Sequence, residues 1–191
     1  MVEKLGNIDR LPFEFDDGGR AAAGFKGTTG DCVVRAVAIA TGQPYAEVYT
    51  ALSDGCATQR LTKRSKPKAS ARNGVNTRRK WFRDYMASLG WKWTPTMHIG
   101  SGCTVHLSPG ELPAGRLIVA VSKHYTAVID GVIRDLFDPS ERGCTIYPPH
   151  TPTNQLPKGA RWLENGNGWA YEPARCVYGY WAGPIVKWVY L

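Results

Sequence analysis

The sequence predicts an α+β fold in which helices come first and strands follow. Apolar residues recur at helical spacing in three segments before residue 90, and the chain then changes to continuous or alternating apolar runs. The length of 191 residues suits one ordinary domain and leaves little room for a second complete core. We therefore expect a single domain over 1–191, with N-terminal helices packed on an antiparallel β-sheet.

Three helices are expected in the first half of the chain. The first, over 31–41, is strongly apolar, is preceded by a turn with Thr28 and Thr29, and ends at Gly42. The second begins at Pro44 and runs to about residue 52, with apolar residues three and four positions apart. The third covers about 77–89 and presents one aromatic face.

The second half of the chain predicts strands. A continuous apolar run over 116–122 is typical of a central strand. Segments 124–129 and 132–137 flank Asp130 and Gly131, a strong hairpin signal. Residues 146–175 are rich in Pro, Gly and Asn and predict a long irregular excursion, after which 176–181 and 185–190 read as strands.

Positive charge is concentrated in one segment. The formal net charge is +8, and nine of the 24 basic residues lie between Arg60 and Lys80, where no Asp or Glu occurs. The remaining 15 basic and 16 acidic residues nearly cancel. We expect an exposed basic loop at about 60–76, either a solvated loop or a handle for nucleic acid or an acidic partner surface. The residues best placed to bind such a partner are Lys63, Arg64, Lys66 and Lys68.

Five cysteines are widely spaced and form no CxxC pair, which favours reduced thiols in a cytoplasm. Cys56, Cys103, Cys144 and Cys176 are interpreted as packing residues. No cofactor or metal site is expected, since His98, Cys103 and His106 lack a fourth ligand at a suitable spacing. No apolar run of membrane-spanning length and no secretory signal pattern occur, so we expect no membrane partner.

One order of residues indicates nucleophilic chemistry: a Cys, then a His, then an Asp. Cys32 lies in the first turn of a predicted helix, where unpaired N–H groups and the helix dipole favour a thiolate. His124, which opens a strand, could take the thiol proton, and a carboxylate on its other nitrogen would fix the tautomer. The backbone N–H of Cys32 would point toward a developing oxyanion.

The carboxylate of this set is open between two residues. If Asp130 and Gly131 form a two-residue turn, residue 126 pairs with 135, and Asp135 shares the face of His124. A three-residue turn with a bulge would instead place Asp138 opposite His124.

This pattern resembles the papain-like cysteine peptidase fold. The resemblance rests on Thr29-Gly30-Asp31-Cys32 before a helix, on the stretch 122–129 that contains His124, and on Asp138-Pro139 after the hairpin. It implies Cys32, His124 and Asp138 as a catalytic triad, and its usual spacing favours Asp138 over Asp135. The Gln that such enzymes carry about six residues before the Cys is replaced here by Lys26. The candidates for the second oxyanion donor are therefore Thr28, Thr29, Lys26 itself or a backbone N–H.

More narrowly, the chain is similar to a group of proteins from tailed phages and prophages. This likeness covers DDGGRAAAGFKGTTGDCVVRAVAIATG, GWKWTPTM, SKHYTAVIDGVIRDLFDPS and CVYGYW. It implies the same fold and triad. Our leading hypothesis is a papain-like thiol hydrolase that cleaves a peptide or isopeptide bond in a protein or peptide substrate, in the host bacterial cytoplasm. The alternative is a catalytically inactive accessory or anti-defence protein that uses the basic loop to bind nucleic acid or an acidic partner.

Overall fold

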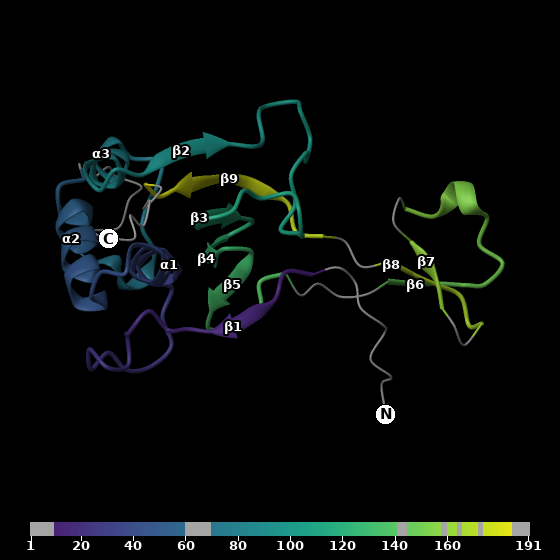
Figure 1. Ribbon diagram of the computed structural model, residues 1–191, viewed down its shortest axis with the longest axis horizontal. Helices are drawn as coiled ribbons and strands as arrows, with labels where there is room; N and C mark the ends of the chain where they lie inside the picture. Colours follow the sequence, from purple (N-terminus) through teal and green to yellow (C-terminus); the bar gives the residue numbers. More distant parts are fainter. Residues whose placement is uncertain are drawn as a thin grey trace, which may run out of the picture.

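The fold is mixed α+β, with three helices gathered on one side of a large sheet (Figure 1). The computed structural model describes residues 10–59, 70–140, 145–157, 160–163, 166–171 and 174–184. The helices are α1 (Cys32–Thr41), α2 (Tyr45–Ala57) and α3 (Lys80–Ser88). The main sheet contains β1 (Phe13–Phe15), β2 (Lys92–Pro95), β3 (Arg116–Val121), β4 (His124–Ile129), β5 (Val132–Asp135) and β9 (Val177–Ala182).

The spatial order of these six strands is β1-β5-β4-β3-β9-β2. Four of the five neighbouring pairs are antiparallel, but β1 pairs with β5 in parallel. The prediction of a wholly antiparallel sheet is therefore wrong at this edge. A three-residue strand is too short to produce a readable period in the sequence, which explains why β1 was not expected.

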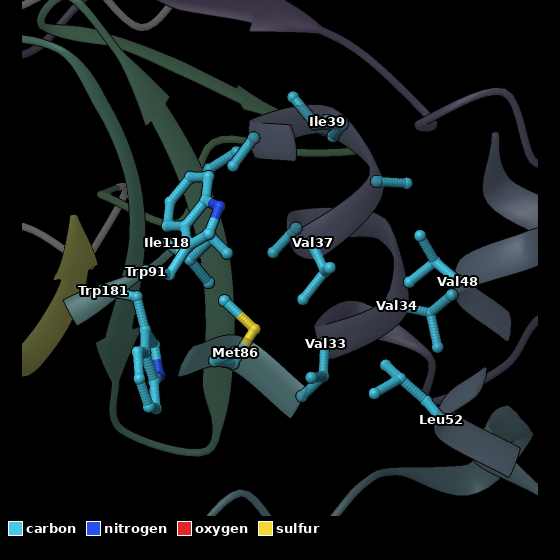
Figure 2. Close-up of a cluster of buried hydrophobic side chains, with 14 of the residues drawn as sticks. Val33, Val34, Val37, Ile39, Val48, Leu52, Met86, Trp91, Ile118 and Trp181 are labelled. Carbon is cyan, nitrogen blue, oxygen red and sulfur yellow. The ribbon is translucent and has the colours of Figure 1, made fainter. Parts of the chain in front are cut away.

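The core lies between the sheet and the helices, with α1 at its centre. Every residue of α1 from Val33 to Ala40 is buried, because the helix is covered by the sheet on one side and by α2 on the other. Figure 2 shows Val34 beside Val48 and Leu52 of α2, while Val37 points toward Ile118 of β3 and Met86 of α3. This central position holds the first residue of α1 in a fixed place against the sheet.

The hairpin between β4 and β5 has a two-residue turn. Ile129 pairs with Val132, and the turn residues Asp130 and Gly131 have φ angles of 48° and 81°. Positive φ at both central positions is the mark of a type I′ turn, which the Asp-Gly pair favours. The hairpin prediction is confirmed in its first strand and its turn, although β5 ends at Asp135 and not at residue 137.

The region predicted to be irregular, 146–175, forms a second sheet. Strands β6 (Thr145–Tyr147), β8 (Trp169–Tyr171) and β7 (Arg161–Trp162) pair in that order, at the end of the molecule away from the helices (Figure 1). A short 3-10 helix, η2 (Thr153–Gln155), lies in the same region. Strands of two or three residues between turns carry no period-2 signal, so the Pro and Gly content dominated the prediction. The expected strand at 185–190 lies outside the described residues.

The predicted basic loop is described only in its last part. Lys63, Arg64, Lys66 and Lys68 lie outside the described residues. At 70–76 the chain is not a free loop: it forms the 3-10 helix η1 (Ala71–Asn73), and Ala71 is fully buried. The hydroxyl of Ser53 accepts from the Ala71 N–H at 3.0 Å, which ties this segment to α2. Among the described helices, none is long and apolar enough to cross a membrane.

Candidate active site

Three elements of the fold bring Cys32, His124 and Asp135 together. Cys32 begins α1, His124 begins β4, and Asp135 ends β5. His124 Nε2 lies 2.6 Å from Asp135 Oδ2, and the imidazole also hydrogen bonds with the Cys32 side chain. Because Nε2 is engaged by the carboxylate, Nδ1 is the nitrogen that faces the sulfur. The imidazole therefore links the thiol to the carboxylate.

The electrostatics of this group favour a charged imidazole. Burial lowers the pKa of His124, but hydrogen bonds with Asp135 and Cys32, together with their negative charge, outweigh it and raise the pKa to about 9. His124 is thus an imidazolium at neutral pH, and its charge stabilises a thiolate at Cys32. Phe137 packs on the His124 ring with a centroid separation of 5.1 Å and keeps water from one face of it.

The structure assigns the carboxylate position to Asp135 and not to Asp138. The two-residue turn puts Asp135 on the side of His124, as the first of the two registers predicts. Asp138 turns toward its own loop, where its Oδ1 accepts from the backbone N–H and the hydroxyl of Ser140 at 2.8 and 2.6 Å. The choice of Asp138 from its spacing is therefore wrong for this geometry, because the turn is one residue tighter than that choice requires.

Of the proposed oxyanion donors, the backbone N–H of Cys32 is well placed, whereas Thr28 and Thr29 are not. Neither Thr28 nor Thr29 lines the cleft next to Cys32, and Thr29 Oγ1 is buried without a hydrogen-bond partner. The Arg20 guanidinium binds the carbonyls of Lys26 and Gly27 at 3.1 and 2.9 Å, which holds this turn away from the cleft. The backbone N–H of Cys32, at the open end of α1, is the donor that the structure leaves beside the sulfur.

A network of buried charged side chains contacts the candidate active site through Asp135. Asp31 is 1% exposed and binds Arg35 within α1, Arg20 at 2.9 Å and the Tyr45 hydroxyl at 2.5 Å. Arg35 in turn lies 3.9 Å from Asp135 through its second terminal nitrogen. This network did not enter the sequence prediction, yet a signal was present: Arg35 is the one charged residue in the apolar segment CVVRAVAIAT, and a charge there must find a buried partner.

Cys32 and His124 open into a cleft of about 1140 Å³. One wall comes from the helical side and includes Gly30, Asn73 and Gly74; the other comes from β2, β9 and the loop that follows β2. Trp93 lines this second wall, while Trp91 is buried in the core. Asn73 and Gly74 were missed because they lie within the basic segment, where the sequence shows no periodicity.

A disulfide joins Cys103 to Cys176, with the two Cα atoms 5.8 Å apart. The interpretation of these two cysteines as reduced packing residues is wrong, because the segment between β2 and β3 folds back against the start of β9. Cys32 is free, and Cys144 lies outside the described residues. The cytoplasmic location stays a prediction, and this pair weakens its basis, since disulfides persist mainly in oxidising compartments.

The histidines considered as metal ligands do not lie close together in one site. His106 Nδ1 lies 3.1 Å from Glu111, away from His98. In the described part of the chain, no group of three His, Cys, Asp or Glu side chains is arranged to hold a metal ion.

Comparison with known proteins gives no match: no protein family, curated protein or solved structure is significantly similar to this chain. The functional conclusion therefore depends on the geometry of the site.

The raised pKa of His124 predicts how stability changes with pH. Its folded-state pKa of about 9 exceeds the ordinary value of 6.5, so folded His124 keeps a proton that the unfolded side chain loses between these limits. A thiolate at Cys32 offsets this proton in the wild type, so the slope is measured in a Cys32→Ser background, where Asp135 still raises the His124 pKa. There the His124 contribution is fully present below pH 6.5 and is lost as the pH rises through the folded-state pKa, by about 1.4 kcal/mol per unit at most. Urea unfolding at pH 6.5, 7.75 and 9 measures this slope. His124→Gln is expected to flatten it and the exposed His150→Gln to keep it; equal slopes in both variants would contradict the prediction.

Proposed function

We propose that this protein is a thiol hydrolase that cleaves a peptide or isopeptide bond. The observation that carries the proposal is the continuous contact from Cys32 through His124 to Asp135 beside an open cleft. A sulfur at a helix N-terminus next to an imidazolium is a nucleophile, and an imidazole held by a buried carboxylate is a proton carrier. The likeness to papain-like peptidases agrees with these roles for Cys32 and His124.

The reaction follows from the order of these groups. The Cys32 thiolate attacks the carbonyl carbon, and the displaced electron pair moves to the oxygen, which the Cys32 N–H stabilises. Collapse of this intermediate breaks the C–N bond, and the leaving amine takes the proton from His124 Nδ1. His124 then removes a proton from water, whose oxygen attacks the thioester and releases the acid and Cys32. Asp135 holds the imidazole in one orientation through both steps.

Cleavage of a peptide library tests the proposal. The wild-type protein, incubated with a mixture of peptides of varied sequence, is expected to produce new amino termini, detected by mass spectrometry. Cys32→Ala should abolish these products, whereas Cys56→Ala, which changes a buried cysteine of α2, should retain them. Products that persist in Cys32→Ala would refute the assignment of the nucleophile.

A further inference from the structure

Three cationic side chains line the cleft. Arg78 and Arg83 contribute from the helical side, and Lys123 contributes from the turn between β3 and β4. Within the described residues, none of the three forms an ion pair, and no Asp or Glu lines the cleft. Asp31 and Asp135 do not line the cleft, and Arg35 and His124 offset their charges. The cleft itself therefore presents a net positive potential.

Arg78 lines the same cleft as the reacting sulfur, beside Thr77 and Tyr125. The Tyr125 hydroxyl bonds to Thr77 Oγ1 at 2.7 Å, which joins the segment that carries Arg78 to β4. Burial raises the pKa of Tyr125, and this side chain also senses the charges of Cys32 and Arg78. A group bound to Arg78 would therefore lie in the cleft into which Cys32 opens.

Lys123 is held in a backbone conformation that lysine seldom adopts. Its φ is 58°, in the left-handed region where glycine is normally preferred. Glycine would adopt this turn at a lower conformational free energy than lysine does. We therefore expect the Lys123 side chain to have a function of its own. Lys123 is exposed, precedes His124 in the chain and lines the same cleft.

We propose that the substrate is an acidic peptide segment, with an Asp or Glu side chain within two residues of the cleaved bond, bound by Arg78 and Lys123. This rests on the hydrolase function proposed above and names its substrate class. The apolar rim formed by Met97, Ile99 and Tyr178, which are 40%, 108% and 41% exposed, would hold a neighbouring apolar residue of the same segment. A peptide suits this site better than a nucleic acid, because the Cys32 thiolate attacks a carbonyl carbon, which a phosphodiester backbone lacks.

Two alkylating agents that differ in charge test the cleft potential. The rate constants of Cys32 with iodoacetate and with iodoacetamide are measured at low ionic strength by mass spectrometry, and their ratio is compared among variants. Arg78→Gln and Lys123→Gln are each expected to lower the ratio about threefold, an effect that 0.5 M salt removes. Glutamine keeps a side chain at the strained position 123. Lys92→Gln, an exposed cation outside the cleft, is the matched control and should keep the wild-type ratio.

A pair of affinity labels tests the peptide. Acetyl-Phe-Asp and acetyl-Phe-Asn chloromethyl ketones differ only in charge, and the Asp compound is expected to label Cys32 at least about threefold faster in wild type but not in Arg78→Gln. Equal rates for the two compounds, with selective labelling of Cys32, would overturn the acidic substrate and leave the hydrolase intact. Failure of iodoacetamide to select Cys32 would overturn both. Stronger protection of Cys32 by oligo-dT than by oligoglutamate of equal charge would replace the peptide with nucleic acid.

Discussion

Replacing Asp135 with alanine is expected to lower the rate of Cys32 alkylation at pH 6, and of peptide cleavage, by about 10²-fold. The carboxylate is the only group that bonds to His124 Nε2 in the described structure, and the His124 pKa of about 9 depends on it. Asp135→Asn separates two contributions: the amide oxygen still accepts from Nε2–H and keeps the ring oriented, but the negative charge is lost. Its rates should therefore fall between those of the wild type and Asp135→Ala.

Asp138→Ala is the matched control for this series. Asp138 bonds only to Ser140 among the described contacts, so its removal should reduce the free energy of unfolding by about 1 kcal/mol and leave the alkylation rate of Cys32 unchanged. A large rate loss in Asp138→Ala with none in Asp135→Ala would contradict the assignment and restore the register with a three-residue turn.

Removing the disulfide is expected to cost about 2–4 kcal/mol of unfolding free energy, because Cys103 and Cys176 close a loop across a sequence separation of 73 residues. The bridge also ties the segment that carries Met97 and Ile99 to the strand that carries Tyr178, so its loss should loosen the apolar rim of the cleft. The double variant Cys103→Ser/Cys176→Ser avoids leaving one new free thiol.

Urea unfolding with and without a reducing agent measures this effect. The reductant should lower the midpoint of the wild type toward that of the double variant and leave the double variant unaffected. An unchanged wild-type midpoint under fully reducing conditions, with both thiols shown to be free by mass spectrometry, would contradict a stabilising role for the bridge.

The positions of the site residues were predictable where nearby residues in the sequence specify a helix start or a turn. The Gly-rich turn, the apolar run and Gly42 placed Cys32 at the start of a helix, and Asp130-Gly131 specified a turn whose register puts Asp135 beside His124. The observed register is one of the two that the sequence allows for this hairpin. The spacing usual in papain-like peptidases favoured Asp138 instead, and that choice failed because the turn is tight.

Long-range contacts were not predictable in this way. The parallel pairing of β1 with β5 and the Cys103–Cys176 bridge join segments far apart in the chain, and their local sequences carry no mark of the partner. The partners in the Arg20–Asp31–Arg35 network could not be predicted either. The single charge of Arg35 in an apolar helix indicated only that a buried partner was needed. Residues 145–171 were misjudged because their strands are too short to show a period.

The central claim is that Cys32 and His124 form a reactive pair, and selective alkylation tests it most directly. At pH 6 an ordinary thiol is less than about 1% ionised, so iodoacetamide modifies it slowly. We predict that Cys32 of the folded wild-type protein reacts at pH 6 at least about 10²-fold faster than Cys56, and that His124→Ala removes this advantage. Labelling of Cys32 that is no faster than that of Cys56, or that is the same in His124→Ala, would contradict the account.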